Sequence, residues 1–123
     1  MPYAAYKLIH LLGIFTMIGA LVAAGMHVLR GGTRADDPYR RVLSVAHGVA
    51  AFLILLGGFG MLARMGVMHE GVPSWAKVKL VIWVALGASM ALPYRGRGLA
   101  RGMLIALPAL LLAAAATALY KPF

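Results

Sequence analysis

The fold is decided by a run of twenty residues near the start of the chain, YKLIHLLGIFTMIGALVAAG (Tyr6–Gly25). Its residues are apolar or glycine, with Lys7, His10 and Thr16 as the exceptions. About 20 mostly apolar residues form a helix long enough to cross the hydrocarbon core of a bilayer. Three similar runs follow, so the sequence predicts transmembrane helices at about 3–29, 40–67, 75–94 and 100–120.

The composition agrees with an integral membrane protein. Of the 123 residues, 63% are hydrophobic and only 12% are charged, whereas soluble domains carry about 25% charged residues. Short connections place sequential helices antiparallel. We therefore expect an all-α, up-down four-helix transmembrane bundle that forms one domain, 1–123. The absence of cysteine from the sequence excludes disulfides, thiol catalysis and iron–sulfur clusters.

The net charge of +9 does not indicate a nucleic-acid partner, because the basic residues cluster at the predicted helix ends. Clusters of this kind are typical of membrane topology signals. Seven arginines flank the first and third connections, and five basic residues lie on the opposite side. This asymmetry predicts a multi-pass protein of the bacterial inner membrane with both termini on the non-cytoplasmic side. The expected partners are the lipid bilayer and other membrane subunits.

Acidic residues are scarce, and all of them fall in predicted connections: Asp36, Asp37 and Glu70. A proton-coupled multidrug transporter of the small four-helix type needs a carboxylate inside the membrane, and catalysis by paired carboxylates needs two. The sequence therefore argues against both classes, and we assign no catalytic residue. Whether the protein is an enzyme stays open, although the scarcity of acidic residues favours a protein without enzymatic activity.

Small residues and histidines recur at the 3–4 spacing of packed helices, which predicts the faces that meet inside the bundle. The predicted seams are His10, Gly13, Met17, Ala20, Ala24 and His27 in the first helix; Arg40, Ser44, His47, Ala51, Ile54, Gly58, Met61 and Met65 in the second; and Gly102, Ala106, Ala109, Ala113, Ala116 and Tyr120 in the fourth.

Depth in the bilayer indicates which polar side chains can meet. At a rise of about 1.5 Å per residue, His10 and Lys79 lie about 10 Å and 8 Å from the membrane centre on the same side, so they could share a site. His27 and His47 fall in the other half, where two imidazoles could bracket a planar cofactor such as haem b. Alternatively, each histidine is hydrogen-bonded to a backbone carbonyl or a serine.

A second candidate metal site lies at the end of the second helix. Met61, Met65 and Met68 lie on one helical face, and His69 follows. Thioether and imidazole groups suit Cu(I), which makes copper handling an alternative. Methionine is also ordinary packing material in a hydrophobic core.

Three motifs resemble those of a known family: KLIHLLGIFTMIGAL (Lys7–Leu21), RRVL (Arg40–Leu43) and WAKVKL (Trp75–Leu80). They are similar to motifs of the HemJ-type protoporphyrinogen oxidases and the related copper-resistance D-type membrane proteins. The matching positions in the first helix are Lys7, His10, Thr16, Gly19, Ala20 and Leu21. The resemblance implies a four-helix bundle, b-haem with His10 as a candidate iron ligand, and a role for Lys79 near the same pocket.

These observations favour a non-catalytic accessory subunit of a larger membrane assembly, such as a respiratory or photosynthetic complex. The family's tryptophan and arginine in the first helix are Met17 and Met26 here, and the membrane spans contain no acid. The alternative is a haem-binding redox protein of the HemJ-like kind that acts in tetrapyrrole oxidation. Copper handling is the weaker alternative.

Overall fold

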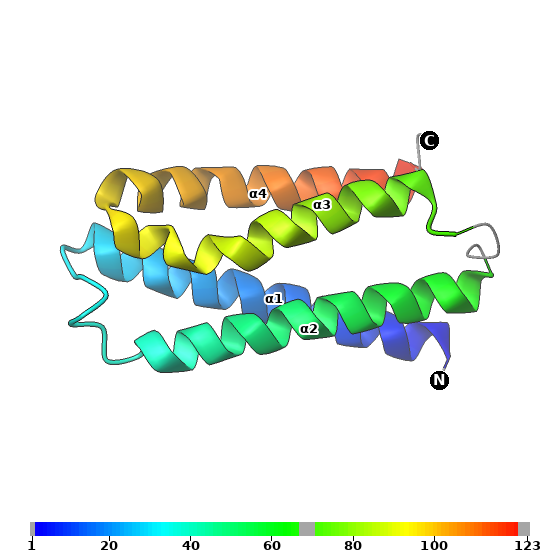
Figure 1. The fold of residues 1–123 in the computed structure, drawn as a ribbon, viewed down its shortest axis with the longest axis horizontal. Helices are drawn as coiled ribbons and strands as arrows, with labels where there is room; N and C mark the ends of the chain where they lie inside the picture. Colours follow the sequence, from blue (N-terminus) through cyan, green and yellow to red (C-terminus); the bar gives the residue numbers. More distant parts are fainter. Residues whose placement is uncertain (1, 67–70, 121–123) are drawn as a thin grey trace.

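A computed structural model describes residues 2–66 and 71–120, and it contains four long helices and two single 3-10 turns (Figure 1). The elements are α1 (Tyr3–Leu29), α2 (Arg40–Met65), α3 (Ser74–Ala88), η1 (Ser89–Ala91), η2 (Pro93–Arg95) and α4 (Arg97–Tyr120). Each long helix, with α3 extended by its two turns to Arg95, is long and apolar enough to span a membrane. The predicted all-α four-helix fold is confirmed.

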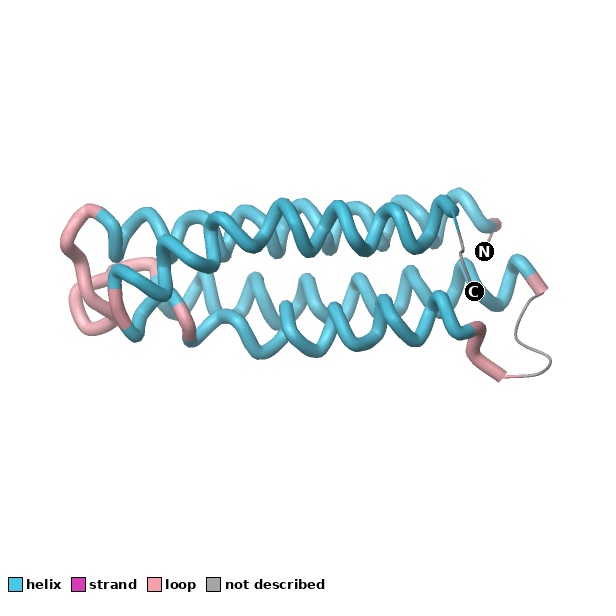
Figure 2. The backbone as a smooth tube through the Cα atoms, turned by 90° about the horizontal axis from the view of Figure 1, so that it is seen from above, coloured by secondary structure: helices cyan, strands magenta, loops and turns pink. Residues whose placement is uncertain are grey.

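The helices run up and down in an antiparallel order, with the starts of α1 and α3 and the ends of α2 and α4 together (Figure 1). We call this the terminal end, and we call the opposite end, with residues 30–39 and 89–96, the loop end. Helix α1 packs mainly against α2 and also against α4, which in turn packs on α3. Figure 2 shows the same bundle turned by 90°. Contact between α2 and α3 is the sparsest between neighbouring helices.

Helix α3 is shorter than the predicted 75–94, because the chain tightens into 3-10 turns after Ala88. The Leu86 carbonyl, which an α-helix would pair with the amide of Met90, accepts the Ser89 hydroxyl at 2.6 Å instead. Pro93 then has no amide hydrogen to offer. Helix α4 begins at Arg97 rather than at 100, and α2 ends at Met65, ahead of a left-handed Gly66 (φ 69°).

Side-chain hydrogen bonds tie the loop end together. The Asp37 carboxylate is buried and accepts the Tyr94 hydroxyl and the Tyr39 amide, each at 2.9 Å. The Arg97 guanidinium donates to the Leu29 carbonyl at 3.1 Å, which joins the start of α4 to the end of α1. The two connections at this end are therefore bound to one another.

Glycine allows the backbones of α1 and α2 to approach closely. A Cβ added at Gly57 would lie 2.6 Å from the backbone nitrogen of His10 and 2.7 Å from the carbonyl oxygen of Tyr6. One added at Gly13 would lie 2.8 Å from the Ala50 carbonyl oxygen. Such contacts are too short for any side chain, so close helix packing here depends on the absence of a Cβ.

The predicted seams are right for α1 and wrong for α4. In α1, five seam residues from His10 to Ala24 are buried, but His27 is not. In α2 the buried residues are His47, Ala50, Gly57 and Leu62. Of these, only His47 belongs to the predicted seam, so the face that packs inside the bundle is rotated away from the predicted one. In α4 the buried face is Ala100, Met103 and Leu107. Larger side chains fill the core there, and most of the predicted small-residue seam points outward.

We expect Gly57→Ala to destabilise the protein by about 1–3 kcal/mol, because the new methyl group would push two backbones apart. Gly48→Ala is the matched control on the same helix, since a Cβ at Gly48 would meet nothing within 4 Å. That control should be neutral or stabilising by up to about 1 kcal/mol. Unfolding in detergent, followed by circular dichroism, tests this. Equal midpoints for the two variants would contradict the close-contact interpretation.

Candidate functional site

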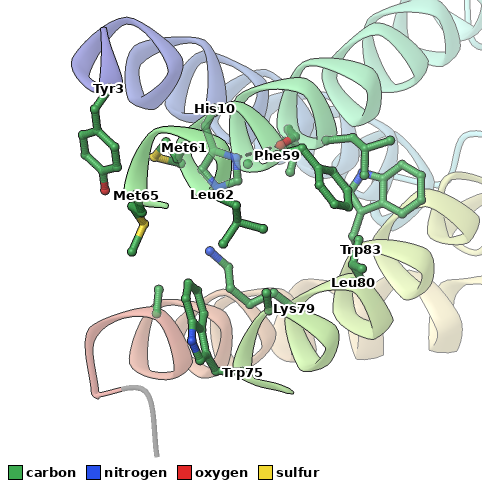
Figure 3. A pocket seen from close by; sticks show the side chains of 15 residues that line it. Tyr3, His10, Phe59, Met61, Leu62, Met65, Trp75, Lys79, Leu80 and Trp83 are labelled. Atoms are coloured by element: carbon green, nitrogen blue, oxygen red, sulfur yellow. Dashed lines mark hydrogen bonds between the residues drawn. The ribbon is translucent and has the colours of Figure 1, made fainter. Parts of the chain in front are cut away.

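A cavity of about 130 Å³ opens between α2 and α3 in the terminal half of the bundle (Figure 3). Helix α1 contributes His10 and Tyr3 to its wall, and α3 contributes Trp75, Lys79 and Trp83. Most of the other lining residues are apolar and come from α2. The cavity lies where two neighbouring helices are poorly packed, because α2 packs closely against α1 and makes only sparse contact with α3.

His10 is held in one orientation on this wall. Its ring is buried, and Nδ1 lies 2.8 Å from the carbonyl oxygen of Ile54. A carbonyl can only accept, so the hydrogen is on Nδ1, and Nε2 of the neutral ring carries a lone pair. The ring packs beside Gly58, where its nearest atoms would lie 3.6 Å from an added Cβ, an ordinary van der Waals contact. Nε2 has no hydrogen-bond partner among the described residues.

Lys79 supplies the charge at the site. Its ammonium group points into the cavity (Figure 3) and has no ion-pair or hydrogen-bond partner in the described part of the chain. Every fully enclosed side-chain nitrogen or oxygen of the described residues has a partner. The unpartnered nitrogens of Lys79 and His10 are therefore open to the cavity. The structure brings together these two side chains, which the sequence placed at similar depth.

A smaller cavity of about 50 Å³ lies on the inner side of the same pair. It shares His10, Ile54, Lys79 and Trp83 with the first cavity, and its remaining walls are apolar side chains of α1, α3 and α4. The space around the two polar groups therefore extends from the terminal end toward the hydrophobic core.

His27 and His47 line neither cavity. The Nε2 of His27 hydrogen-bonds the Thr33 carbonyl and the Asp36 carboxylate, both at 2.8 Å, so this ring packs on the first connection. The Nε2 of His47 donates to the Leu86 carbonyl at 2.9 Å and joins α2 to the end of α3. Both rings make a carbonyl hydrogen bond, as the alternative interpretation of these histidines expected, and they do not join His10 in one site.

Neither metal prediction gains a complete site. Met61 and Met65 line the larger cavity, whereas Met68 and His69 lie outside the described residues. Among the described residues, no group of three or more histidine, aspartate or glutamate side chains could hold a metal ion. Copper binding therefore stays a prediction.

The residues fit haem only in part. A Nδ1–H donated to a carbonyl is the arrangement that directs a histidine Nε2 to a metal. However, the cavity of about 130 Å³ is smaller than the roughly 300–1,000 Å³ of pockets for drug-sized ligands, and a porphyrin is larger still. The cavity does not enclose the macrocycle, so we derive no chemistry through haem, and its ligation by His10 stays a prediction.

Trp83 belongs to the site but was not predicted. Its indole N–H donates to the Ala51 carbonyl at 2.8 Å, and its ring lines both cavities. A tryptophan in the middle of an apolar helix needs a partner for its N–H, which is the signal that could have marked it. Within the described part of the chain, Trp83 and His47 are the side chains that hydrogen-bond between α2 and α3.

Comparison of the chain with protein-family models, curated proteins and solved structures finds no match.

The contact between His27 and the first connection predicts a pH effect at Asp36. The pKa of this exposed carboxyl is held below its ordinary 3.8, first by the Thr33 amide at 2.6 Å and then by the His27 ring. A carboxyl with a depressed pKa stabilises the folded loop above its unfolded pKa, and this contribution is lost as the pH falls through the lower folded pKa. The Thr33 amide resonance should report a transition with its midpoint below 3.8.

The control is Asp36→Asn, which removes the titrating group and should abolish that transition in an NMR titration of the detergent-solubilised protein. A midpoint at or above 3.8 in the wild-type protein would contradict the loop contact.

Proposed function

We propose that this protein is a non-catalytic accessory subunit of a larger bacterial inner-membrane assembly, such as a respiratory or photosynthetic complex. It binds a transmembrane helix of a partner subunit through one face of α4. The observation that carries the proposal is the outward position of Gly102, Ala106, Ala109 and Ala113, which we call the small-residue face.

The small-residue face suits protein better than lipid. Its four residues follow the 3–4 spacing of a helix-packing seam, yet all four are exposed and α4 packs through its other side. In a bilayer, small residues favour helix association because they let backbones approach closely. Flexible lipid chains gain nothing comparable from such a surface. The adjoining exposed face carries Ile105, Leu112 and Leu119, each at least 70% exposed, and those side chains suit lipid.

The scarcity of usable acids supports a role without catalysis. Asp36 accepts from Thr33 and His27, and Asp37 accepts from Tyr39 and Tyr94, so both described carboxylates serve the first connection. No carboxylate lies within the described parts of the four spans. General acid–base chemistry inside the membrane would have to rely on histidine, lysine or tyrosine side chains, of which His10 and Lys79 line the cavity.

The arginine distribution supports the proposed orientation. Arginines are concentrated at the loop end, in the first connection, in η2 and in the first turns of α2 and α4. By the positive-inside rule, this end faces the cytoplasm and the terminal end faces away from it.

The test is Ala106→Leu, which fills the small-residue face without touching the core. We expect the wild-type protein, solubilised gently from its own membranes, to migrate in a native gel well above its own mass. The variant should migrate free of the assembly, because a leucine side chain prevents close helix contact.

The matched control is Ala115→Leu, an equally small and exposed residue on the far edge of the outer surface of α4. It should leave migration unchanged. If Ala106→Leu also co-migrates with the assembly, the small-residue face is not the contact. If the purified wild-type protein alone gives the large species, the partner is a second copy rather than another subunit.

A further inference from the structure

We propose that the larger cavity is a binding site for the head of a single-chain amphiphile with one carboxylate, of the fatty-acid kind, with Lys79 as its counter-ion. This site is separate from the small-residue face of α4 and does not depend on the proposed accessory role.

An anion would stabilise the ammonium group of Lys79, and the described chain does not provide one. An unpaired ammonium group is costly in an apolar environment, and ionisable groups within membrane spans generally have partners. The two described acids, Asp36 and Asp37, are at the loop end, whereas Lys79 is in the terminal half. His10 offers a lone pair at Nε2, which can accept a hydrogen bond but cannot neutralise a charge.

The direction of the Lys79 side chain separates this interpretation from simple anchoring. Lysines near helix ends commonly extend their ammonium groups along the surface to lipid headgroups. Lys77 is exposed and free to do so. Lys79 is only partly exposed, and its ammonium group points between α2 and α3 into the cavity (Figure 3). A ligand that neutralises it must therefore enter the cavity.

The walls select an amphiphile rather than a free ion. Leu62, Phe59, Trp75 and Trp83 surround the polar pair with apolar surface. An inorganic anion would lose its hydration against these walls and gain only one charge partner. A carboxylate on an alkyl chain gains the same partner and also buries methylene groups, each worth about 0.8 kcal/mol.

Size restricts the ligand to a small head on a single chain. The volume of about 130 Å³ holds a carboxylate and its first methylene groups, but it is well below the roughly 300 Å³ at which pockets begin to enclose larger ligands. The rest of the chain leaves through the sparsely packed boundary between α2 and α3, where it meets the lipid chains of the bilayer.

The experiment uses the protein in phosphatidylcholine nanodiscs with cis-parinaric acid, a fluorescent fatty acid, as the probe. Trp75 and Trp83 are the only tryptophans in the sequence, and both line the cavity, so energy transfer from them reports occupancy. We expect saturable transfer for the wild-type protein. Lys79→Met should weaken binding by about tenfold or more, the effect of removing one partner of a desolvated charge pair.

Lys77→Met is the matched control, because it removes the same charge two residues away and outside the cavity. It should change affinity by less than about twofold, as expected for an exposed charge. Lys79→Arg keeps the charge and should retain binding. Wild-type affinity in Lys79→Met would overturn the proposal.

A ligand control keeps the test decisive if Lys79→Met does not fold. The methyl ester of the same fatty acid has no charge and should bind the wild-type protein at least about tenfold more weakly. Equal binding of acid and ester would overturn the carboxylate site.

A haem propionate is the other possible source of a carboxylate, and an absorption spectrum of the purified protein, oxidised and dithionite-reduced, tests for it. A Soret band lost in Lys79→Met would assign the site to a haem propionate and overturn the single-chain ligand.

Discussion

The close contact between the backbones of α1 and α2 is the constraint on which the rest of the structure depends. It needs Gly57 and Gly13 to lack side chains, because a Cβ at either position would overlap the neighbouring backbone. The contact brings His10 within reach of the Ile54 carbonyl and thereby fixes the imidazole. Because α2 packs so closely on α1, its contact with α3 is sparse, and the Lys79 side chain of α3 extends into the space between them.

Much of this architecture could be predicted from the sequence, because bilayer thickness fixes the length of an apolar helix. Four runs of suitable length gave the all-α bundle, and three of its four helices begin within a residue or so of their predicted positions. The ends were less predictable. Where α3 ends depends on which groups donate hydrogen bonds to the Leu86 carbonyl. One donor is His47, which is 39 positions away in the sequence, so local sequence does not reveal this contact.

The site was predicted in part for the same reason. The rise of a helix sets depth, so His10 and Lys79 were placed at one level, and both line one cavity. Which side of a helix faces the core depends on how the helix is rotated about its axis, and the sequence of α4 does not determine that rotation. Its small residues form a plausible packing face, but the larger Met103 and Leu107 fill the core. Whether a histidine turns to a cofactor or to a carbonyl depends on partners such as Thr33 and Leu86, which spacing does not show.

Among the described residues, the side-chain hydrogen bonds between α2 and α3 lie away from the terminal end, and this has a mechanical consequence. Toward the loop end α3 is attached to α2 through Trp83 and His47, and Tyr94 just beyond it binds Asp37. Toward the terminal end the two helices are separated by the cavity. A change in the spacing between α2 and α3 in the terminal half would therefore widen or narrow the cavity while the hydrogen bonds of Trp83 and His47 stay in place.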